Sequence, residues 1–549
     1  MPKRILGLLL CLLGPLCADS YFDGYHNPRQ LAKTLKTLQN NYENLIQVES
    51  LAKTTGERDV WLVSISENPQ KVKPGIAILG GLEGDDPATT ELCLNFIEFA
   101  ASEKQNNEHI RNVLNRYVFY IFPSVNPDAA ARLWQKPSIA DSLNARPVDL
   151  DSDGQVSEDD VDDLNNDGWI THMRILDPAG SWAADSLFPQ LLRNVDPAQH
   201  EFGQFKVLSE GVDNDGDGHW NEDPRGGVNF NQNFSYDYKP FQVGAGPFPV
   251  SEIETRAVAD FLFSHDNIAL VFSFSHADNL LSPWHISKIG KIERGTPLDG
   301  VLPHDAKIYS YVSQQFNEQA GFEELNPSEP QPGNFAQWAY FHYGRWSFST
   351  PLPWPSLLAQ SDSVFVENGD PLVEQRRVLQ WARDHQISDV FVEWSEIDHP
   401  AFQQQVEVGG FRPGVLKNPP VDSLETIASS FNSFLFQLVD WLPQLQLTTN
   451  AEKLENDVYR ITANIQNTGY FPTSCQVGVH LQWVRKIKAE LQLDRQSNLM
   501  SGDPFYLLDA IDGGGAVEKS WMLLTESSET VVRVGSPSVG YVEQTIRLE

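Results

Sequence analysis

Segments typical of strands and of helices alternate along most of the chain, from Tyr21 to Leu445. Short apolar runs such as Pro74–Leu79 and Val118–Pro123 have the length and residue types of buried strands. Longer segments such as Thr89–Ala101 repeat apolar residues at helical spacing. This alternation predicts an α/β fold with a mixed or parallel sheet flanked by helices. Further elements are expected as helices at Leu31–Tyr42, Ser251–Ser264 and Leu424–Leu442, and as strands at Ile46–Glu49, Trp61–Ile65 and Ala269–Ser275.

The last part of the chain has a different pattern. Short alternating segments separated by turn residues, among them "NTG" and "DGGG", predict an all-β sandwich domain at residues 446–549. The α/β domain is then expected at residues 19–445, interrupted by an acidic, loop-like insertion at 146–227. The strands expected in the sandwich are Tyr459–Ile465, Val477–Trp483, Val531–Val534 and Glu543–Leu548.

The N-terminus has the pattern of a secretory signal peptide. Lys3 and Arg4 precede an apolar run, Ile5–Leu16, and small residues follow it. That run is too short to span a bilayer comfortably, and no later segment is apolar enough to do so. We therefore expect residues 1–18 to be removed and the protein to be secreted, periplasmic or extracellular. Lipid attachment at Cys17 is a second, less favoured interpretation.

The charge of the chain restricts its partners. A formal net charge of −34 over 549 residues disfavours binding to nucleic acid and to anionic lipid. A surface with this excess of carboxylates favours the binding of divalent cations. Cys93 and Cys475 lie far apart in the sequence, in different expected domains, so two separate buried thiols are predicted and a disulfide is not.

Three acidic loops in the insertion have the spacing of calcium sites. The stretch "DLDSDGQVSEDD" places oxygen ligands at alternate positions, then a glycine, a backbone carbonyl and a terminal carboxylate, as in an EF-hand loop. The other two loops are partial copies, and a solvated acidic loop is the alternative for each. A structural role is expected, because a cation can order a segment with few apolar residues. The predicted ligands are Asp149, Asp151, Asp153, Gln155 and Asp160, then Asp163, Asn165 and Asp167, and finally Asp213, Asp215 and Asp217.

Several segments together resemble the zinc metallocarboxypeptidase family, the carboxypeptidase A-like fold, and its secreted bacterial branch. The resemblance covers roughly residues 21–440. It implies a carboxypeptidase-like sheet, zinc as the cofactor and removal of C-terminal residues from peptides as the activity. The segments are "GGLEGDDPATTEL", "FPSVNPDAAARLW", "GGVNFNQNF", "SEIETRAVADFL", "SFSHADNLLSPW" and "NFAQWAYFHYG".

The resemblance places different residue types at the family's metal positions. The first zinc motif, histidine and glutamate separated by two residues, falls on Glu83 and Asp86. The third ligand falls at the end of a later strand, on Ser275 or His276. Strand alternation favours Ser275, whereas a bulge would bring His276 to the site. Carboxylates alone make a harder and less zinc-selective site than imidazole with carboxylate.

The other functional positions of the family are also substituted. The pair that holds the substrate carboxylate corresponds to Asn231 and Gln232, and the carbonyl-polarising arginine corresponds to Gln135. Glutamine lacks the charged, bidentate fork of arginine. Pro351 falls at the position of the general-base glutamate, and proline transfers no proton. Glu393 is the nearest later carboxylate that could stand in for it.

These substitutions favour a secreted metallocarboxypeptidase-like protein without peptidase activity, in which the zinc site is lost and the fold has a ligand-binding or structural role, with a peptide or a carbohydrate as the ligand to be expected. Two alternatives stay open. One is an active metallopeptidase with Glu83, Asp86 and His276 as ligands and Glu393 as base. The other is a calcium-dependent adhesive or surface protein that uses the insertion and the sandwich.

Overall fold

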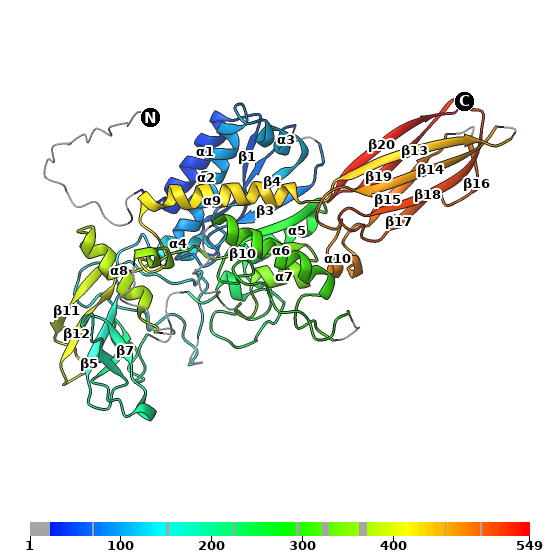
Figure 1. Ribbon diagram of the computed structural model, residues 1–549. Coiled ribbons are helices and arrows are strands. Elements are labelled where there is room, and N and C mark those ends of the chain that lie inside the picture. Colours follow the sequence, from blue (N-terminus) through cyan, green and yellow to red (C-terminus); the bar gives the residue numbers. More distant parts are fainter. Residues whose placement is uncertain are drawn as a thin grey trace, which may run out of the picture.

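The computed structural model describes residues 22, 24–68, 71–149, 153–221, 223, 226–292, 296–320, 328, 330–361, 370–455, 457–494 and 497–548. The predicted signal peptide, Cys17 and the predicted ligand Asp151 lie outside these residues. Figure 1 shows three parts: a central α/β body, a smaller sheet on one side of it, and an elongated β sandwich at the C-terminal end.

A six-stranded sheet forms the centre of the α/β body. Its order is β1-β2-β4-β3-β9-β10, and the β4, β3, β9 and β10 strands run parallel to one another. β1 and β2 pair antiparallel at one edge. The predicted mixed sheet is therefore confirmed. The strands are β1 Ile46–Lys53, β2 Asp59–Ile65, β3 Gly75–Leu79, β4 Val118–Phe122, β9 Ile268–Phe274 and β10 Trp346–Thr350.

Both faces of this sheet are buried, because alternate residues of the central strands enter different apolar clusters. In β3, Ile76 and Ile78 pack with residues of α1, α2 and α9, whereas Ala77 and Leu79 pack with residues of α5 and α7. Residues next to the helix define where α1 begins: the Asn27 side chain caps it and Pro28 occupies its first turn. The helices are α1 Pro28–Asn41, α2 Pro87–Glu103, α3 Glu108–Arg116, α4 Pro127–Arg132, α5 Ile253–Ser264, α6 Pro303–Ala320, α7 Phe335–Phe341, α8 Val373–Asp384 and α9 Val421–Asp440.

The acidic insertion is not wholly loop-like, and that expectation was wrong. It contains β5, β6, β7 and β8, which join two later strands in a six-stranded sheet of order β11-β12-β5-β8-β6-β7. The cause is a small apolar cluster in which Met173 and Ile175 alternate with polar residues and pack on Val406 and Val408. The strands are β5 His172–Leu176, β6 Trp182–Ala184, β7 Leu192–Asn194, β8 Phe205–Ser209, β11 Phe391–Ile397 and β12 Val406–Phe411.

The C-terminal part forms two four-stranded antiparallel sheets around one apolar cluster, as predicted for a sandwich. The expected strand at Val477–Trp483 was wrong, because α10, Gln476–His480, occupies its first half. The Asp305 carboxylate accepts a hydrogen bond from the backbone N–H of Gln476 at 2.7 Å and favours the start of this helix. The strands are β13 Leu445–Lys453, β14 Val458–Asn467, β15 Ile487–Gln492, β16 Ser497–Ser501, β17 Phe505–Leu508, β18 Ala516–Thr525, β19 Glu529–Ser536 and β20 Gly540–Arg547.

Two smaller expectations concern the membrane and the cysteines. No helix among the described residues combines the length and the apolar character that a transmembrane span requires.

Cys93 and Cys475 are both buried and unpaired, as predicted. Burial raises the pKa of both thiols, so neither has the character of a reactive thiolate.

Candidate functional site

The loop between β3 and α2 brings three acidic side chains to the carboxyl end of the main sheet. Glu83, Asp85 and Asp86 are 7%, 3% and 8% exposed, which is unusual for carboxylates. Gly84 makes this turn with a φ of +65°, and a Cβ there would lie 2.3 Å from the Cβ of Ala129. A side chain at this position would therefore clash with α4, and glycine keeps the loop tight against the sheet.

Glu83 belongs to a buried hydrogen-bond network with residues from two other segments. Asn231 donates from Nδ2 to the Glu83 Oε1 at 2.8 Å and to the Ser275 Oγ at 2.8 Å. Ser275 donates from Oγ to the same Glu83 oxygen at 3.3 Å. The Asn231 Oδ1 accepts from the backbone N–H of Phe335 at 2.9 Å. The network ties the β3 loop, the end of β9 and the start of α7 together.

Asp86 is buried beside this network without full compensation. Its Oδ1 has no hydrogen-bond partner within the described part of the chain. Burial, and then the nearby carboxylates of Glu83 and Asp85, raise the pKa of Asp86 well above its usual range. This environment favours the neutral carboxylic acid.

Asp85 has a cationic partner from a distant segment. The Lys417 Nζ lies 2.5 Å from the Asp85 Oδ2. Burial lowers the Lys417 pKa, but the carboxylates of Asp85, Glu83 and Asp86 together outweigh burial and raise it. Asn418 holds the same loop by donating to the Asp85 carbonyl oxygen at 3.0 Å and accepting from the Ala88 N–H at 3.0 Å. Sequence reasoning missed both residues, since only the fold brings them to this loop.

The two predicted metal candidates that follow β9 lie in different environments. Ser275 is 3% exposed and lies in the network, whereas His276 is exposed to solvent. The backbone N–H of Ser275 donates to the carbonyl oxygen of Thr350, the last residue of the neighbouring strand β10, at 3.0 Å. Pro351 is the next residue after that strand. Glu393 is exposed on β11 in the other sheet, which Figure 1 shows well away from β3.

The two glutamines at the predicted substrate-binding positions lie in different surroundings. Gln232 is half-buried in a short 3-10 helix, Phe230–Gln232, and Gln135 is exposed in the turn after α4. The nearby Arg132 is buried and pairs with Asp141 at 2.9 Å. Burial raises the pKa of Asp141 to about 6, and Arg132 only partly offsets that effect. The arginine at the end of α4 was a signal that sequence reasoning did not use.

A cavity of ≈ 890 Å³ lies against residues 278–285, which follow β9, and its volume is within the range of small-ligand sites. The buried indole of Trp284 lines it, and its Nε1 has no hydrogen-bond partner in the described part of the chain. Other lining residues are Asp237, Asp278, His285, Asp299 and His342.

The acidic loops of the insertion meet side by side. Ligating oxygens of Asp153, Glu158 and Asp215 lie within 4.8 Å of one another, and so do those of Asp213, Asp215 and Asp217. The loops are joined by Asp159, which is fully buried and accepts from the Asn214 N–H at 2.8 Å. Glu158 was missed by the loop pattern. Both groups lie in these loops, and neither includes Glu83 or Asp86.

The other predicted calcium residues have local partners. In the second loop, Asp163 accepts from the backbone N–H of Gly168, and Asn165 donates to Asp167 at 2.9 Å. Gln155 donates from its side chain to Asp153 at 3.0 Å. Asp149 accepts from the Gly154 N–H at 3.1 Å, and Asp160 lies in the same loop.

Comparison with known proteins identifies the relatives of this chain. Residues 31–152 and 204–362, more than half of the chain, match the model of the zinc carboxypeptidase family, and residues 444–547 match a domain of unknown function, DUF8731. Human carboxypeptidase D is 32% identical over 134 residues, which cover 24% of this chain and 10% of that protein. A zinc carboxypeptidase of Saccharothrix mutabilis subsp. capreolus is 28% identical over 111 residues, which cover 20% of this chain and 26% of that protein.

These matches therefore span a tenth to about a quarter of the relatives' own lengths. A crystal structure of thrombin activatable fibrinolysis inhibitor aligns with 76% of this chain and 74% of its own, at 13% identity and a TM-score of 0.41. The extent of the family match, together with the mixed sheet and its polar carboxyl edge, decides the classification: this chain belongs to the zinc carboxypeptidase family.

Proposed function

We propose that this protein is a secreted member of the family that has no peptidase activity and binds a ligand in the inherited cleft. The main support is the Glu83–Asn231–Ser275 network. By the sequence resemblance, its members correspond to positions that the family uses for zinc and for the substrate carboxylate, and they are hydrogen-bonded to one another. A metal ion would have to displace these buried hydrogen bonds.

The side chains at this position do not fit zinc. Zinc in proteins prefers imidazole nitrogen, thiolate and carboxylate ligands in a tetrahedral arrangement. Here Ser275 offers a neutral hydroxyl, Asp86 is held in conditions that favour its neutral acid, and His276 is exposed. Pro351 also has no group that could accept a proton from water. We derive no hydrolytic step from this arrangement.

The cavity lined by Trp284 supports a binding role. Trp284 lines its wall, and an aromatic ring in that position can contact an apolar side chain or a sugar ring. Asp237, Asp278 and Asp299 give the wall an acidic character. A peptide with a basic side chain, or a carbohydrate with its many hydroxyl groups, has the chemistry to bind there.

Three proteins test the loss of activity. The wild type should contain no stoichiometric zinc by elemental analysis and release no C-terminal residue from a peptide library. The variant Glu83→His/Asp86→Glu/Ser275→His rebuilds the donor set and should take up zinc. The matched control, Lys291→His, adds a histidine on the surface and should not. Hydrolysis by the wild type that a chelator abolishes and zinc restores would overturn the proposal and favour the active alternative.

A calcium-dependent role for the insertion has its own support in the two carboxylate groups around Asp215. Calcium takes six to eight oxygen ligands, and such groups supply them. We propose that calcium binds here and orders the insertion. Calcium titration with melting curves tests this role. A calcium-dependent gain in partner binding, with no change in stability, would instead favour the adhesive alternative.

A further inference from the structure

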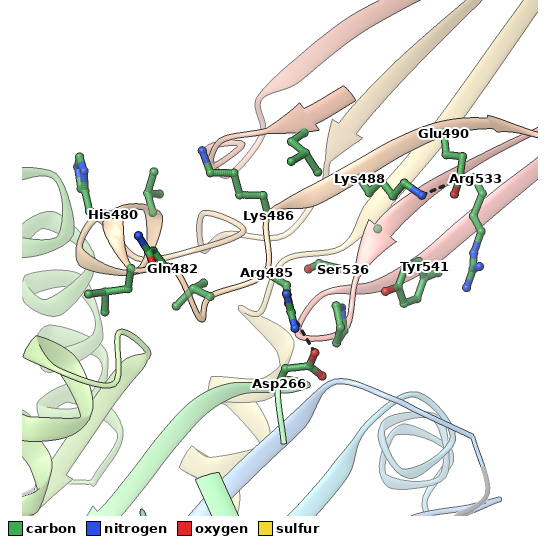
Figure 2. Close-up of a pocket in the computed structure, with 16 residues that line it drawn as sticks. Asp266, His480, Gln482, Arg485, Lys486, Lys488, Glu490, Arg533, Ser536 and Tyr541 are labelled. Carbon is green, nitrogen blue, oxygen red and sulfur yellow. Dashed lines mark hydrogen bonds and ion pairs between the residues drawn. The ribbon is translucent and has the colours of Figure 1, made fainter. Parts of the chain in front are cut away.

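A second cleft lies far from the loop of Glu83, where the β sandwich meets the α/β body. It has a volume of ≈ 760 Å³, within the range of ligand sites. Its floor is the outer face of the sheet β17-β15-β19-β20, and its walls are the segment after α10 and the turn at Asp266. Figure 2 shows side chains from these three sources around the opening.

The strand register shapes the floor. One row across the sheet is Leu507, Lys488, Gly535 and Tyr541, so the glycine leaves a gap between the lysine and the tyrosine. A Cβ at Gly535 would lie 2.2 Å from the carbonyl oxygen of Gly540, so this position excludes a side chain. Leu507 and Tyr541 are 59% and 46% exposed and border the gap with apolar surface. The result is a shallow trough across the sheet.

The cleft is basic in an otherwise acidic protein. It is lined by four basic residues, Arg485, Lys486, Lys488 and Arg533, and by two acidic ones, Asp266 and Glu490. The chain as a whole has a formal net charge of −34. A local excess of positive charge against that background attracts anions to this one face.

Among the basic residues of the cleft, Arg533 has guanidinium N–H groups that are available to a ligand. Lys488 pairs with Glu490 at 2.7 Å, and Arg485 lies 3.4 Å from Asp266. The Arg533 guanidinium has no carboxylate partner in the described part of the chain and stacks on the Tyr541 ring, 4.4 Å from its centroid. Figure 2 shows it directed away from Glu490. A stacked guanidinium is held in place with its N–H edge open for a bidentate contact to a carboxylate or a sulfate.

The geometry favours one class of macromolecule. β19 is already paired on both sides, with β15 and β20, so a peptide cannot add a strand at this floor. Nucleic acid is disfavoured because Tyr541 is the only Phe, Tyr or Trp ring among the residues that line the cleft, whereas nucleic-acid sites stack successive bases on several such rings. A sugar chain needs only a shallow surface with apolar patches and donors, which the trough around Gly535 supplies. We propose that this cleft binds an acidic polysaccharide, with Arg533 contacting its anionic group and Tyr541 contacting a sugar ring.

Calorimetric titration of the full chain tests the proposal, in the presence of a chelator so that calcium does not bridge sugar and acidic loops. The probes are polygalacturonate, a carboxylated chain, and heparin, a sulfated one. Neutral dextran and polyglutamate serve as comparisons. We expect at least one acidic glycan to bind, with an affinity that falls as salt is added. The tighter of the two identifies the anionic group.

Arg533→Ala should weaken this binding about tenfold, because it removes a charged bidentate contact. Tyr541→Ala should weaken it without changing the charge. The matched control is Arg460→Ala, an exposed arginine on the other sheet, which should stay within about twofold of the wild type. Absence of binding to both glycans, or equal binding by wild type and Arg533→Ala, would overturn the proposal. Polyglutamate binding as tightly as the glycans would overturn it in favour of an acidic peptide.

Discussion

Replacing Asn231 with alanine should destabilise the α/β domain by about 4 kcal/mol. Its side chain donates to Glu83 and Ser275 and accepts from Phe335, all out of contact with water. A hydrogen bond to a charged group contributes about 1.5–3 kcal/mol, and a neutral one about 0.5–1.5 kcal/mol. One bond of the first kind and two of the second give a total of about 4 kcal/mol.

Calorimetry should detect this loss as a lower melting temperature. Unfolding entropy is about 2.1 cal/mol/K per residue, so a unit of about 400 residues has an unfolding entropy near 0.8 kcal/mol/K. A loss of about 4 kcal/mol then lowers the melting temperature by about 5 °C. The control is Asn106→Ala, in the exposed turn after α2, which should not change it.

A second variant separates the network from simple packing. Asn231→Asp keeps an acceptor for the Phe335 N–H but places a second carboxyl group beside Glu83. The like charges should make its destabilisation grow with pH, whereas that of Asn231→Ala should not. If Asn231→Ala melts within about 1 °C of the wild type, the buried network does not hold the three segments together.

The remaining predictions concern the neighbouring carboxylates and the insertion. Asp86→Asn should stabilise the protein at neutral pH. The Asp86 pKa is higher in the folded state than in the unfolded state, so the wild type loses stability as the pH rises from the unfolded pKa through the folded one. In denaturant titrations the advantage of the variant should therefore vanish near about pH 4. Lys417→Met should cost about 2 kcal/mol of unfolding free energy, since it leaves the Asp85 carboxylate buried and unpaired although the lysine itself is partly exposed; an unchanged denaturation midpoint would contradict this. Calcium at about 100 times its Kd should stabilise the insertion by about 2.7 kcal/mol, and Asp215→Asn should remove most of that gain while the exposed Asp509→Asn should not.

The main sheet was predicted well from the sequence, because the residues that determine its strands and the neighbouring helix starts lie within or next to those elements. The run at Gly75–Leu79 is apolar throughout and is buried on both faces, so its strand type and bounds follow from composition. Asn27 and Pro28 likewise define the start of α1. The segment Val477–Trp483 failed for the opposite reason: a carboxylate from α6 caps α10, and that partner is 171 positions away in the sequence.

The candidate site was predictable only in part. The resemblance grouped Glu83, Asp86 and Asn231 with either Ser275 or His276, and the fold brings Glu83, Asn231 and Ser275 into contact. Lys417 and Asn418 could not be inferred, because nothing local marks a residue that reaches a loop 332 positions earlier. Whether Asp86 is neutral also depends on burial, which no single motif specifies.

The pairing of β5 with β12 makes the acidic insertion inseparable from a segment more than 200 residues later. Arg174 and Glu407 also form an ion pair across this junction at 2.7 Å. Excising residues 146–227 would leave β12 paired only with β11, so the backbone groups on its other edge would lose their partners, and Val406 and Val408 would be exposed to water. Such an edge recruits other chains, so the shortened protein should aggregate. Any relative that lacks the insertion is therefore expected to lack β11 and β12 as well, and the two segments are expected to be gained or lost together.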